Sequence, residues 1–206
     1  MSSIACSSLY VLGFGGHARS VADVALAAGV KSLLFVDANA APNEDFAGFA
    51  VVSSMPHPAS DGWAVFAAQG DNLRRRQALE SAVLRSVVLV SPTATIGRLA
   101  EIGEGTLVAH HAYIGPAARV GRGVIINTGA IVEHECEVGA FSHISVNAVV
   151  AGRSRIGSNV LVGAGAIVID GIRVCDDVMI GAGATVVDHI VATGTYIGTP
   201  ARLMRS

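Results

Sequence analysis

The chain has 206 residues, of which 51% are hydrophobic and 15% charged, and its formal net charge is -2. This length and apolar content are sufficient to bury the core of one large domain or two small ones. Glycine interrupts the apolar residues every few positions, and no run approaches the roughly 18 residues that a transmembrane helix needs, so we expect none. A single lysine against thirteen arginines gives no basic surface for nucleic acid.

The first residues, MSSIACSSLY, lack the basic start and the apolar core of a secretory signal, so a cytoplasmic location is the default expectation. The three cysteines, Cys6, Cys136 and Cys175, are widely spaced and form no CxxC pair. This pattern supports neither a disulfide framework nor a four-cysteine zinc site. We expect three free thiols.

Residues 1 to about 90 alternate between patterns typical of strands and helices. Apolar runs predict strands at 9–12, 32–36, 63–68 and 87–90, and helical periodicity predicts helices at 18–28, closed by Gly29, and at about 73–84. The stretch between the second and third strands is irregular and rich in proline. This order implies a small parallel sheet covered by helices. The cluster from Arg74 to Arg76 is interpreted as a solvated helix face.

A different pattern starts at Ile96. From there to Val186 every sixth residue is Ile or Val, at sixteen successive positions without an insertion or a gap. A six-residue period is typical of the hexapeptide β-helix, in which three hexads form one triangular coil. Sixteen hexads predict just over five coils and a prism about 25 Å tall. We expect the Ile and Val side chains to point inward, and the glycines that often follow them to adopt positive φ at the corners.

The segment EHECE, residues 133–137, combines five possible metal ligands or proton carriers. In the six-residue register, Val132 and Cys136 point inward, so Cys136 is interpreted as a small core residue. His134 falls in the corner between them and points outward, so it does not converge with Cys136 on one ion. This segment therefore predicts no metal site. Chemically, a histidine near its reference pKa of about 6.5 is suited to general-base catalysis at neutral pH.

The chain resembles the hexapeptide-repeat acyltransferases, whose members form left-handed parallel β-helices and trimers. VLGFGGHA, GDNLRRR, NTGAIVEHECEVGAFSHISVNA and GTPARLMR give a narrower resemblance to sugar O-acyltransferases of the sialic acid O-acetyltransferase type. Within that family the chain is most similar to bacterial nucleotide-amino-sugar N-acetyltransferases of the bacillosamine pathway. The resemblance implies a Rossmann-like nucleotide-sugar-binding domain at 1–92 and a left-handed β-helix at 93–206 that binds acetyl-CoA and performs catalysis. It also implies a homotrimer with active sites between subunits.

The resemblance assigns the general base to His134 and its orienting carboxylate to Glu135. It places Asn127 and His143 beside the reaction, although Asn127 is almost equally well interpreted as a left-handed turn residue. The zinc carbonic anhydrases of this fold use two histidines five positions apart, and no such pair occurs here. We expect acetyl-CoA in the groove between two prisms, with backbone N–H groups near Gly152 as candidate oxyanion donors. The residues expected along that groove are Asn127, His143, Gly152, Gly163, Gly181 and Ala182.

The turn GFGGHA follows a strand and opens a helix. Gly13, Gly15 and Ala18 fit the G-x-G-x-x-G/A fingerprint of NAD-binding domains, and Asp37 follows about twenty residues later. The half of the chain before the β-helix is too short for the two halves that bind a dinucleotide. A nucleotide sugar can bind to this turn in the same way, because N–H groups at a helix N-terminus bind a diphosphate. The residues expected in this pocket are Gly13, Gly15, Gly16, His17, Asp37, Gly70, Asp71 and Asn72.

Together these features favour an acetyl-CoA-dependent N-acetyltransferase that acts on an amino group of a deoxyamino sugar linked to UDP, GDP or dTDP. The nearest alternative is an O-acetyltransferase acting on sialic acid or a related sugar, because the same histidine and glutamate could activate a hydroxyl. An NAD-dependent oxidoreductase and a noncatalytic nucleotide-sugar-binding scaffold remain as alternatives from other classes. We expect no metal, no nucleic acid and no membrane insertion.

Overall fold

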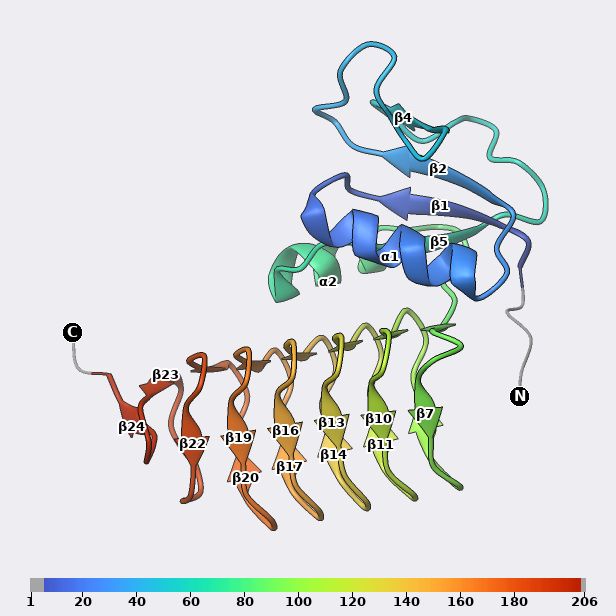
Figure 1. Cartoon of the computed structure of the whole chain (residues 1–206). Coiled ribbons are helices and arrows are strands. Elements are labelled where there is room, and N and C mark those ends of the chain that lie inside the picture. Colours follow the sequence, from blue (N-terminus) through green and yellow to red (C-terminus); the bar gives the residue numbers. More distant parts are fainter. Residues whose placement is uncertain (1–5, 205–206) are drawn as a thin grey trace.

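The computed structural model describes residues 6–204 and shows two parts that differ in architecture. An α/β domain stands over the N-terminal coils of a parallel β-helix, and both of its helices lie close to those coils (Figure 1). The β-helix continues beyond the α/β domain toward the C-terminus, so the C-terminal coils stay uncovered in this view. Within the described residues no helix is long and apolar enough to cross a membrane.

The α/β domain contains one five-stranded sheet in the order β3-β4-β2-β1-β5. Its strands β1, β2, β4 and β5 are parallel, and β3 pairs antiparallel with β4. The predicted strands at 9–12, 32–36 and 63–68 correspond to β1, β2 and β5, whereas the β3–β4 hairpin lies in the stretch that was expected to be irregular. The strands are β1 (Ser8–Leu12), β2 (Ser32–Val36), β3 (Asp45–Phe46), β4 (Phe49–Val52) and β5 (Ala64–Ala67).

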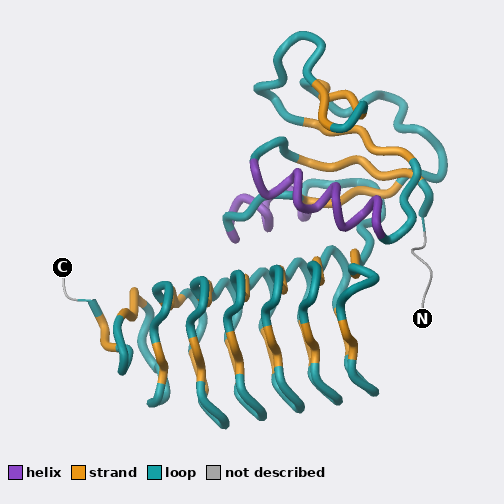
Figure 2. The backbone as a smooth tube through the Cα atoms, viewed as in Figure 1, coloured by secondary structure: helices purple, strands orange, loops and turns teal. Residues whose placement is uncertain are grey.

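Two helices cover this sheet, α1 (Gly16–Ala27) and α2 (Asn72–Glu80) (Figure 2). Helix α1 buries Val21, Val24 and three alanines, and Gly29 beyond its end takes a φ of +105°, as expected of a glycine after a helix C-terminus. Helix α2 begins at an Asp71 side chain that accepts a hydrogen bond from the Arg74 N–H over 2.8 Å. It ends four residues earlier than its predicted end.

The β-helix is a left-handed prism with three sheets, named here by what their outer surfaces present. The domain-facing sheet contains β6, β9, β12, β15, β18, β21, β23 and β24; the apolar-faced sheet contains β7, β10, β13, β16, β19 and β22; the charged-faced sheet contains β8, β11, β14, β17 and β20. Successive coils pair in parallel, except for the terminal β23–β24 pair, which is antiparallel. The chain therefore visits the three sheets in turn.

The strands of the domain-facing sheet are β6 (Leu89–Val90), β9 (Leu107–Val108), β12 (Ile125–Ile126), β15 (His143–Ile144), β18 (Leu161–Val162), β21 (Val178–Ile180), β23 (Gly194–Ile197) and β24 (Arg202–Leu203). Those of the apolar-faced sheet are β7 (Thr95–Ile96), β10 (Tyr113–Ile114), β13 (Ile131–Val132), β16 (Val149–Val150), β19 (Ile167–Val168) and β22 (Thr185–Val186). Those of the charged-faced sheet are β8 (Glu101–Ile102), β11 (Arg119–Val120), β14 (Glu137–Val138), β17 (Arg155–Ile156) and β20 (Arg173–Val174).

The predicted inward register is confirmed from Val108 to Val186, where every sixth residue is buried in one core. Ile96 is 38% exposed, because it lies in the open first coil. The strand expected at 87–90 in the N-terminal sheet was wrongly assigned: β6 pairs with β9 of the β-helix. Val90 lies six residues before Ile96, so the hexad register itself continues back to it. The predicted boundary at residue 92 stays a prediction.

The corners correct the expected role of the glycines. Glycines directly after the inward residues do not have positive φ; instead a Cβ at Gly97 or Gly139 would lie 2.4 or 2.5 Å from backbone atoms of the next coil. Positive φ occurs three residues after each inward position, at every sixth residue from Leu99 to Gly183. Close stacking, and not turn geometry, therefore requires the glycines at the first corner position.

The three outer surfaces differ in chemistry, because one side chain in each strand points out. The apolar-faced sheet presents Tyr113, Ile131, Val149 and Ile167, of which Ile167 is 41% exposed. The charged-faced sheet alternates acids and bases from Glu101 to Arg155, and Arg155 lies 3.7 Å from Glu137. The outward residues of the charged-faced sheet are Glu101, Arg119, Glu137, Arg155 and Arg173.

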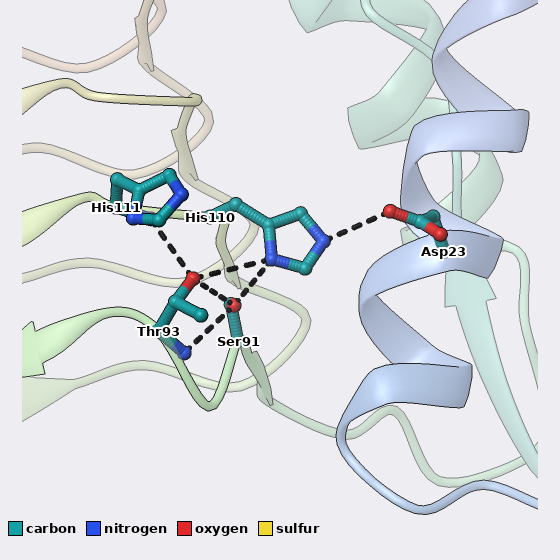
Figure 3. Close-up of polar contacts among 5 residues, drawn as sticks. All are labelled: Asp23, Ser91, Thr93, His110 and His111. Atoms are coloured by element: carbon teal, nitrogen blue, oxygen red, sulfur yellow. Dashed lines mark hydrogen bonds and ion pairs between the residues drawn. The ribbon is translucent and has the colours of Figure 1, made fainter.

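The domain-facing sheet packs under the α/β domain. Leu107, Ala109 and Ile125 belong to the same buried cluster as the core of that domain. At one edge of the contact, His110 Nε2 lies 2.9 Å from Asp23 Oδ2 of α1, and its Nδ1 lies 2.7 Å from Ser91 Oγ (Figure 3). Apolar packing and these hydrogen bonds together fix the α/β domain on the β-helix.

Candidate active site

His134 lies where the apolar-faced and charged-faced sheets meet, a corner that we call the His134 corner. Its side chain is 43% exposed, and its Nδ1 lies 3.2 Å from Glu135 Oε2. Glu135 holds a φ of +58° at the left-handed position of the corner, which turns its carboxylate back toward the preceding residue. The Nε2 atom of His134 is the ring nitrogen that remains for a substrate.

Gly152 lies next to the His134 ring, one coil further along. A Cβ added to Gly152 would lie 2.6 Å from both Cε1 and Nε2 of His134. Because Gly152 has no side chain, the His134 ring can occupy this space. On the same corner Arg153 forms an ion pair with Asp170, beyond the ring.

Cys136 points into the prism, as predicted. It has no exposed surface, and its thiol contacts the carbonyl oxygen of Ala151 over 3.1 Å. Burial raises the pKa of Cys136 to about 11, so this thiol stays protonated at neutral pH and is a poor nucleophile. Among the described residues no group of three or more His, Cys, Asp or Glu side chains is arranged to hold a metal ion.

Asn127 begins the corner between the domain-facing and apolar-faced sheets, which we call the Asn127 corner. The alternative that Asn127 is a left-handed turn residue is wrong, because Gly129 takes the positive φ in this hexad. The amide of Asn127 accepts a hydrogen bond from the Thr128 N–H over 2.8 Å and faces His143 Nε2 over 3.1 Å. Gly163, Gly181 and Ala182 lie on the same corner in later coils, and a Cβ at Gly163 would lie 2.6 Å from Ala182 N.

His143 points out of the domain-facing sheet, one residue before the inward Ile144, and the α/β domain covers it. Its Nδ1 lies 3.3 Å from the Gly70 carbonyl oxygen, which only accepts hydrogen bonds, so Nδ1 carries a proton. Its Nε2 therefore accepts from the Asn127 amide. Burial, together with the charge of Arg75, lowers the pKa of His143 to about 3. His143 is a neutral histidine with both ring nitrogens engaged.

The GFGGHA turn joins β1 to α1. Gly13 takes a φ of +97°, which favours glycine, and no atom lies within 4 Å of a Cβ built on Gly15 or Gly16. Both carboxylate oxygens of Asp37 are engaged within the domain. They accept hydrogen bonds from the backbone N–H groups of Phe14 and Asn39 over 2.8 and 2.9 Å. Asp37 thus holds the glycine turn, a role that the sequence pattern did not predict for it.

A second loop, Gln69–Asn72, lies beside this turn. A Cβ at Gly13 would be 3.1 Å from Gln69 Nε2, and one at Gly70 would be 3.8 Å from His17 Cβ. Both loops follow the carboxyl ends of adjacent strands, β1 and β5, with β2 on the other side of β1. This is the crevice where open α/β sheets bind ligands. The sequence-predicted residues Gly13–His17 and Gly70–Asn72 are therefore brought together.

Two polar atoms in this crevice have no hydrogen-bond partner. His17 Nε2 and Gln69 Oε1 are both buried from solvent and unpaired. Burial, and secondarily Arg75, lowers the pKa of His17 to about 4, so its ring is neutral. Buried polar atoms are rarely left unsatisfied in a folded protein, so an ordered water molecule or a polar group of a ligand is expected beside them. A groove of about 360 Å³ continues from Gly70–Leu73 over β18, β21 and β23.

Arg75 corrects the interpretation of the arginine cluster as a solvated face. Its side chain is 1% exposed, and it donates hydrogen bonds to both parts of the chain. A periodicity signal was available, because Arg75 lies four residues before the buried Leu79 and so on the same helix face. Arg76 does follow the prediction: it forms an exposed ion pair with Glu80 over 2.9 Å.

The contact of Ser91, His110 and Asp23 has the composition of a hydrolase triad but not its accessibility. Ser91 is 1% exposed, and Thr93 Oγ1 also lies 3.3 Å from His110 Nδ1 (Figure 3). A nucleophile has to reach its substrate, which this buried hydroxyl does not. We assign this group to domain packing.

Within one chain the predicted site residues separate into two groups. His134, Glu135 and Gly152 occupy the His134 corner, which is the vertex opposite the domain-facing sheet. Asn127, His143, Gly163, Gly181 and Ala182 lie on or beside that sheet, near the crevice of the α/β domain. One chain alone therefore does not bring His134 to the crevice.

Sequence and structure comparisons identify the family of the chain. The family described as PglD N-terminal domain matches residues 8–82, and the bacterial transferase hexapeptide family, six repeats, matches residues 153–188. The acetyltransferase domain of PglB from Neisseria gonorrhoeae FA1090 is 34% identical, with a TM-score of 0.91 over 96% of this chain and 100% of that one. The chain belongs to the PglD-type family of hexapeptide-repeat nucleotide-amino-sugar N-acetyltransferases. It is an acyltransferase.

Two further structures of the PglD-type family carry ligands. The same PglB domain was solved in complex with acetyl coenzyme A; it is 33% identical, with a TM-score of 0.91 over 97% of this chain and 100% of that one. A histidine-to-alanine mutant of GDP-perosamine N-acetyl transferase from Caulobacter crescentus was solved with CoA and GDP-perosamine. It is 29% identical, with a TM-score of 0.86, and both chains are covered in full. The search of curated proteins found no match.

Proposed function

We propose that this protein transfers the acetyl group of acetyl-CoA to an amino group of a nucleotide-linked deoxyamino sugar. The observation that carries the proposal is the likeness, over the full length of both chains, to an N-acetyltransferase bound to CoA and GDP-perosamine. That likeness covers the β-helix and the α/β domain together, so it includes both halves of a two-substrate site. The groove of about 360 Å³ that begins at Gly70–Leu73 supports a ligand beside the α/β domain.

In the proposed reaction, His134 is the general base. The sugar amine attacks the thioester carbonyl carbon, so that an N–C bond forms, the C–S bond breaks and one amine proton passes to His134 Nε2. The neighbouring Glu135 carboxylate, 3.2 Å from Nδ1, holds the proton on Nδ1 and stabilises the imidazolium. The proton then moves from His134 to the CoA thiolate, which leaves as the thiol. General-base catalysis of this kind contributes about 10²- to 10⁴-fold.

The α/β domain would bind the nucleotide part of the acceptor. The N–H groups of Gly15, Gly16 and His17 at the start of α1 suit a diphosphate, because a helix N-terminus carries a partial positive charge. No side chain fills the space at Gly15 and Gly16. His17 Nε2 and Gln69 Oε1 would then complete their hydrogen bonding with the nucleotide or the sugar.

The site requires a second copy of the chain. His134 lies at the vertex opposite the crevice, and the apolar-faced sheet connects its corner to the Asn127 corner. The outward apolar residues of that sheet, the half-buried Tyr113, Ile131 and Val149 and the exposed Ile167, suit a subunit interface. A homotrimer packed through this sheet would set His134 of one subunit against the Asn127 corner of the next. Acetyl-CoA would lie in the groove between them, along Gly163 and Gly181.

The test is release of CoA thiol when the protein is mixed with acetyl-CoA and a panel of UDP-, GDP- and dTDP-linked amino sugars. We expect turnover with at least one acceptor and, for His134→Ala, a loss of at least about 100-fold with an unchanged melting temperature. His57→Ala is the matched control, because His57 is an exposed histidine in the loop between β4 and β5 and is not among the proposed site residues. Turnover with no member of the panel would refute the proposed function, and wild-type turnover of His134→Ala would refute the role of His134.

A further inference from the structure

A single buried arginine connects the sugar-nucleotide crevice to the β-helix. Arg75 Nη1 donates to the carbonyl oxygens of Gln69 and Gly70 over 3.1 and 3.2 Å. Its Nε donates to the Gly123 carbonyl over 2.7 Å, and its Nη2 donates to the Phe141 carbonyl over 2.9 Å. One guanidinium therefore binds the loop of the α/β domain and two coils of the β-helix at the same time.

These acceptors are neutral, which is unusual for a buried cation. The remaining two are the Ser142 carbonyl at 3.3 Å and the Asn72 side-chain oxygen at 2.8 Å. Burial lowers the pKa of Arg75 to about 10, against the opposing effect of Asp71, so the group stays charged at neutral pH. The planar guanidinium has five N–H donors in a fixed geometry. All of its acceptors except the Asn72 side chain are backbone carbonyl oxygens.

The Gly70 carbonyl joins this arginine to the proposed reaction groove. It accepts from Arg75 and also from the Nδ1–H of His143, at 3.3 Å. His143 in turn accepts from Asn127, at the corner where acetyl-CoA is proposed to bind. Asn72 is held in a similar way, because its oxygen accepts from Arg75 and its Nδ2 donates to the Val160 carbonyl over 3.3 Å.

We propose that Arg75 is a positioning residue for the sugar nucleotide: it fixes the loop Gln69–Asn72 in register with the β-helix. The inference rests on the proposed function, because it assumes that this loop binds the acceptor. Arg75 itself touches no substrate. Its loss leaves the carbonyls of Gln69 and Gly70 without their shared donor, and the loop is then free to move away from the crevice.

A positioning role and a purely structural role predict different effects on the binding of the two substrates. The sugar nucleotide contacts the loop that Arg75 holds, whereas acetyl-CoA is proposed to lie along the Asn127 corner. Loss of positioning therefore raises the KM and Kd of the sugar nucleotide selectively. A purely structural role lowers the melting temperature and the fraction of active protein, but the molecules that remain folded keep both KM values.

The experiment compares Arg75→Met, Arg75→Lys and the control Arg74→Met, which changes the exposed neighbour on the same helix. KM values for both substrates are measured, and the Kd values of CoA and of the best UDP-, GDP- or dTDP-linked amino sugar are measured by calorimetry. For Arg75→Met we expect a rise of about tenfold or more for the sugar nucleotide, as for one lost charge-assisted hydrogen bond. We expect a change below about twofold for CoA, an intermediate value for Arg75→Lys and no change for Arg74→Met.

Three results overturn the inference in distinguishable ways. If Arg75→Met keeps the wild-type KM and Kd of the sugar nucleotide, Arg75 is only structural. If Arg75→Met does not fold, Arg75→Lys decides, because it keeps the charge but not the planar set of donors, and an unchanged sugar-nucleotide Kd then rejects positioning. If the wild-type protein binds none of the sugar nucleotides, the proposed function fails together with this inference.

Discussion

The His134 imidazole occupies space that only a glycine at position 152 leaves open: a Cβ on Gly152 would lie 2.6 Å from the ring Nε2. Gly152→Ala therefore displaces the ring. Because His134 is 43% exposed, the ring rotates away at little cost in stability. We expect a fall in kcat of about 10- to 100-fold, comparable to misplacement of a catalytic group by about 1 Å, with a melting temperature close to wild type.

Gly171→Ala is the control for Gly152→Ala. Gly171 lies on the same corner, where a Cβ would meet only open space, and its positive φ is shared by Ala117 in an earlier coil. We expect its kcat to match the wild type. Equal losses in the two variants would show that the corner, and not the ring position, limits activity.

Glu135→Gln tests the carboxylate beside His134. The pair is partly exposed, with 43% and 62% of the two side chains accessible, so solvent screens the charge. Exposed pairs of this kind contribute about 0.2–1 kcal/mol, which predicts a loss in kcat of about fivefold at most. Steady-state kinetics at saturating substrates measures it. A loss as large as that of His134→Ala would mean that Glu135 itself transfers the proton.

Acid should destabilise the fold through the two buried neutral histidines. Burial, assisted by Arg75, lowers the pKa of His143 to about 3 and that of His17 to about 4. An unfolded histidine titrates near 6.5, so between pH 6.5 and about 3 the unfolded chain binds more protons than the folded one. The contribution of these histidines to the free energy of unfolding is fully present above pH 6.5. It decreases as the pH falls, by about a few kcal/mol in total.

The measurement is the free energy of unfolding in urea at several pH values between 7 and 4. In His143→Gln one of the two titrating groups is gone, so the decrease between pH 7 and 4 should be smaller than in the wild type. His111→Gln, at an exposed corner, should keep the wild-type decrease. If His143→Gln and the wild type lose the same stability, His143 is not held neutral by the fold.

The hexad register predicted the β-helix because each inward position sees the same narrow interior, and the same rule placed Cys136 inside and His134 outside. Single-chain patterns do not show what covers an outward residue. His143 was expected in the acetyl-CoA groove and Arg75 on a solvated helix face, and both are covered at the contact between the two parts of the chain. Periodicity also did not separate positions that need glycine for stacking from those that need positive φ, which is why Asn127 could also be interpreted as a left-handed turn residue.

The apolar-faced sheet should hold the assembly together. In Ile167→Arg a cation replaces a 41% exposed apolar residue of this sheet. An unpaired charge buried at an interface costs several kcal/mol, so we expect a shift from trimer to monomer by light scattering and a parallel loss of acetyl transfer. Arg173→Glu, on the charged-faced sheet, should stay trimeric and active. A trimeric Ile167→Arg would mean that another face forms the interface.

A site shared between subunits predicts that two inactive variants restore activity when mixed. Gly16→Glu introduces a carboxylate where the diphosphate is proposed to bind, in space with no atom within 4 Å of the Cβ, so the fold should tolerate it. His134→Ala removes the base but leaves the crevice intact. In mixed trimers, a crevice from a His134→Ala subunit meets an intact His134 from a Gly16→Glu subunit.

With equal amounts and random assembly, about one quarter of the sites combine both intact halves, because each half is intact with a probability of about one half. Co-expression of the two variants in equal amounts under the same tag yields this unselected mixture of trimers, and thiol release measures its activity. Each variant alone should be nearly inactive, and the mixture should recover about a quarter of the wild-type kcat. A mixture as inactive as its components would place His134 and the crevice of the same subunit in one site, contrary to their positions on opposite sides of the prism.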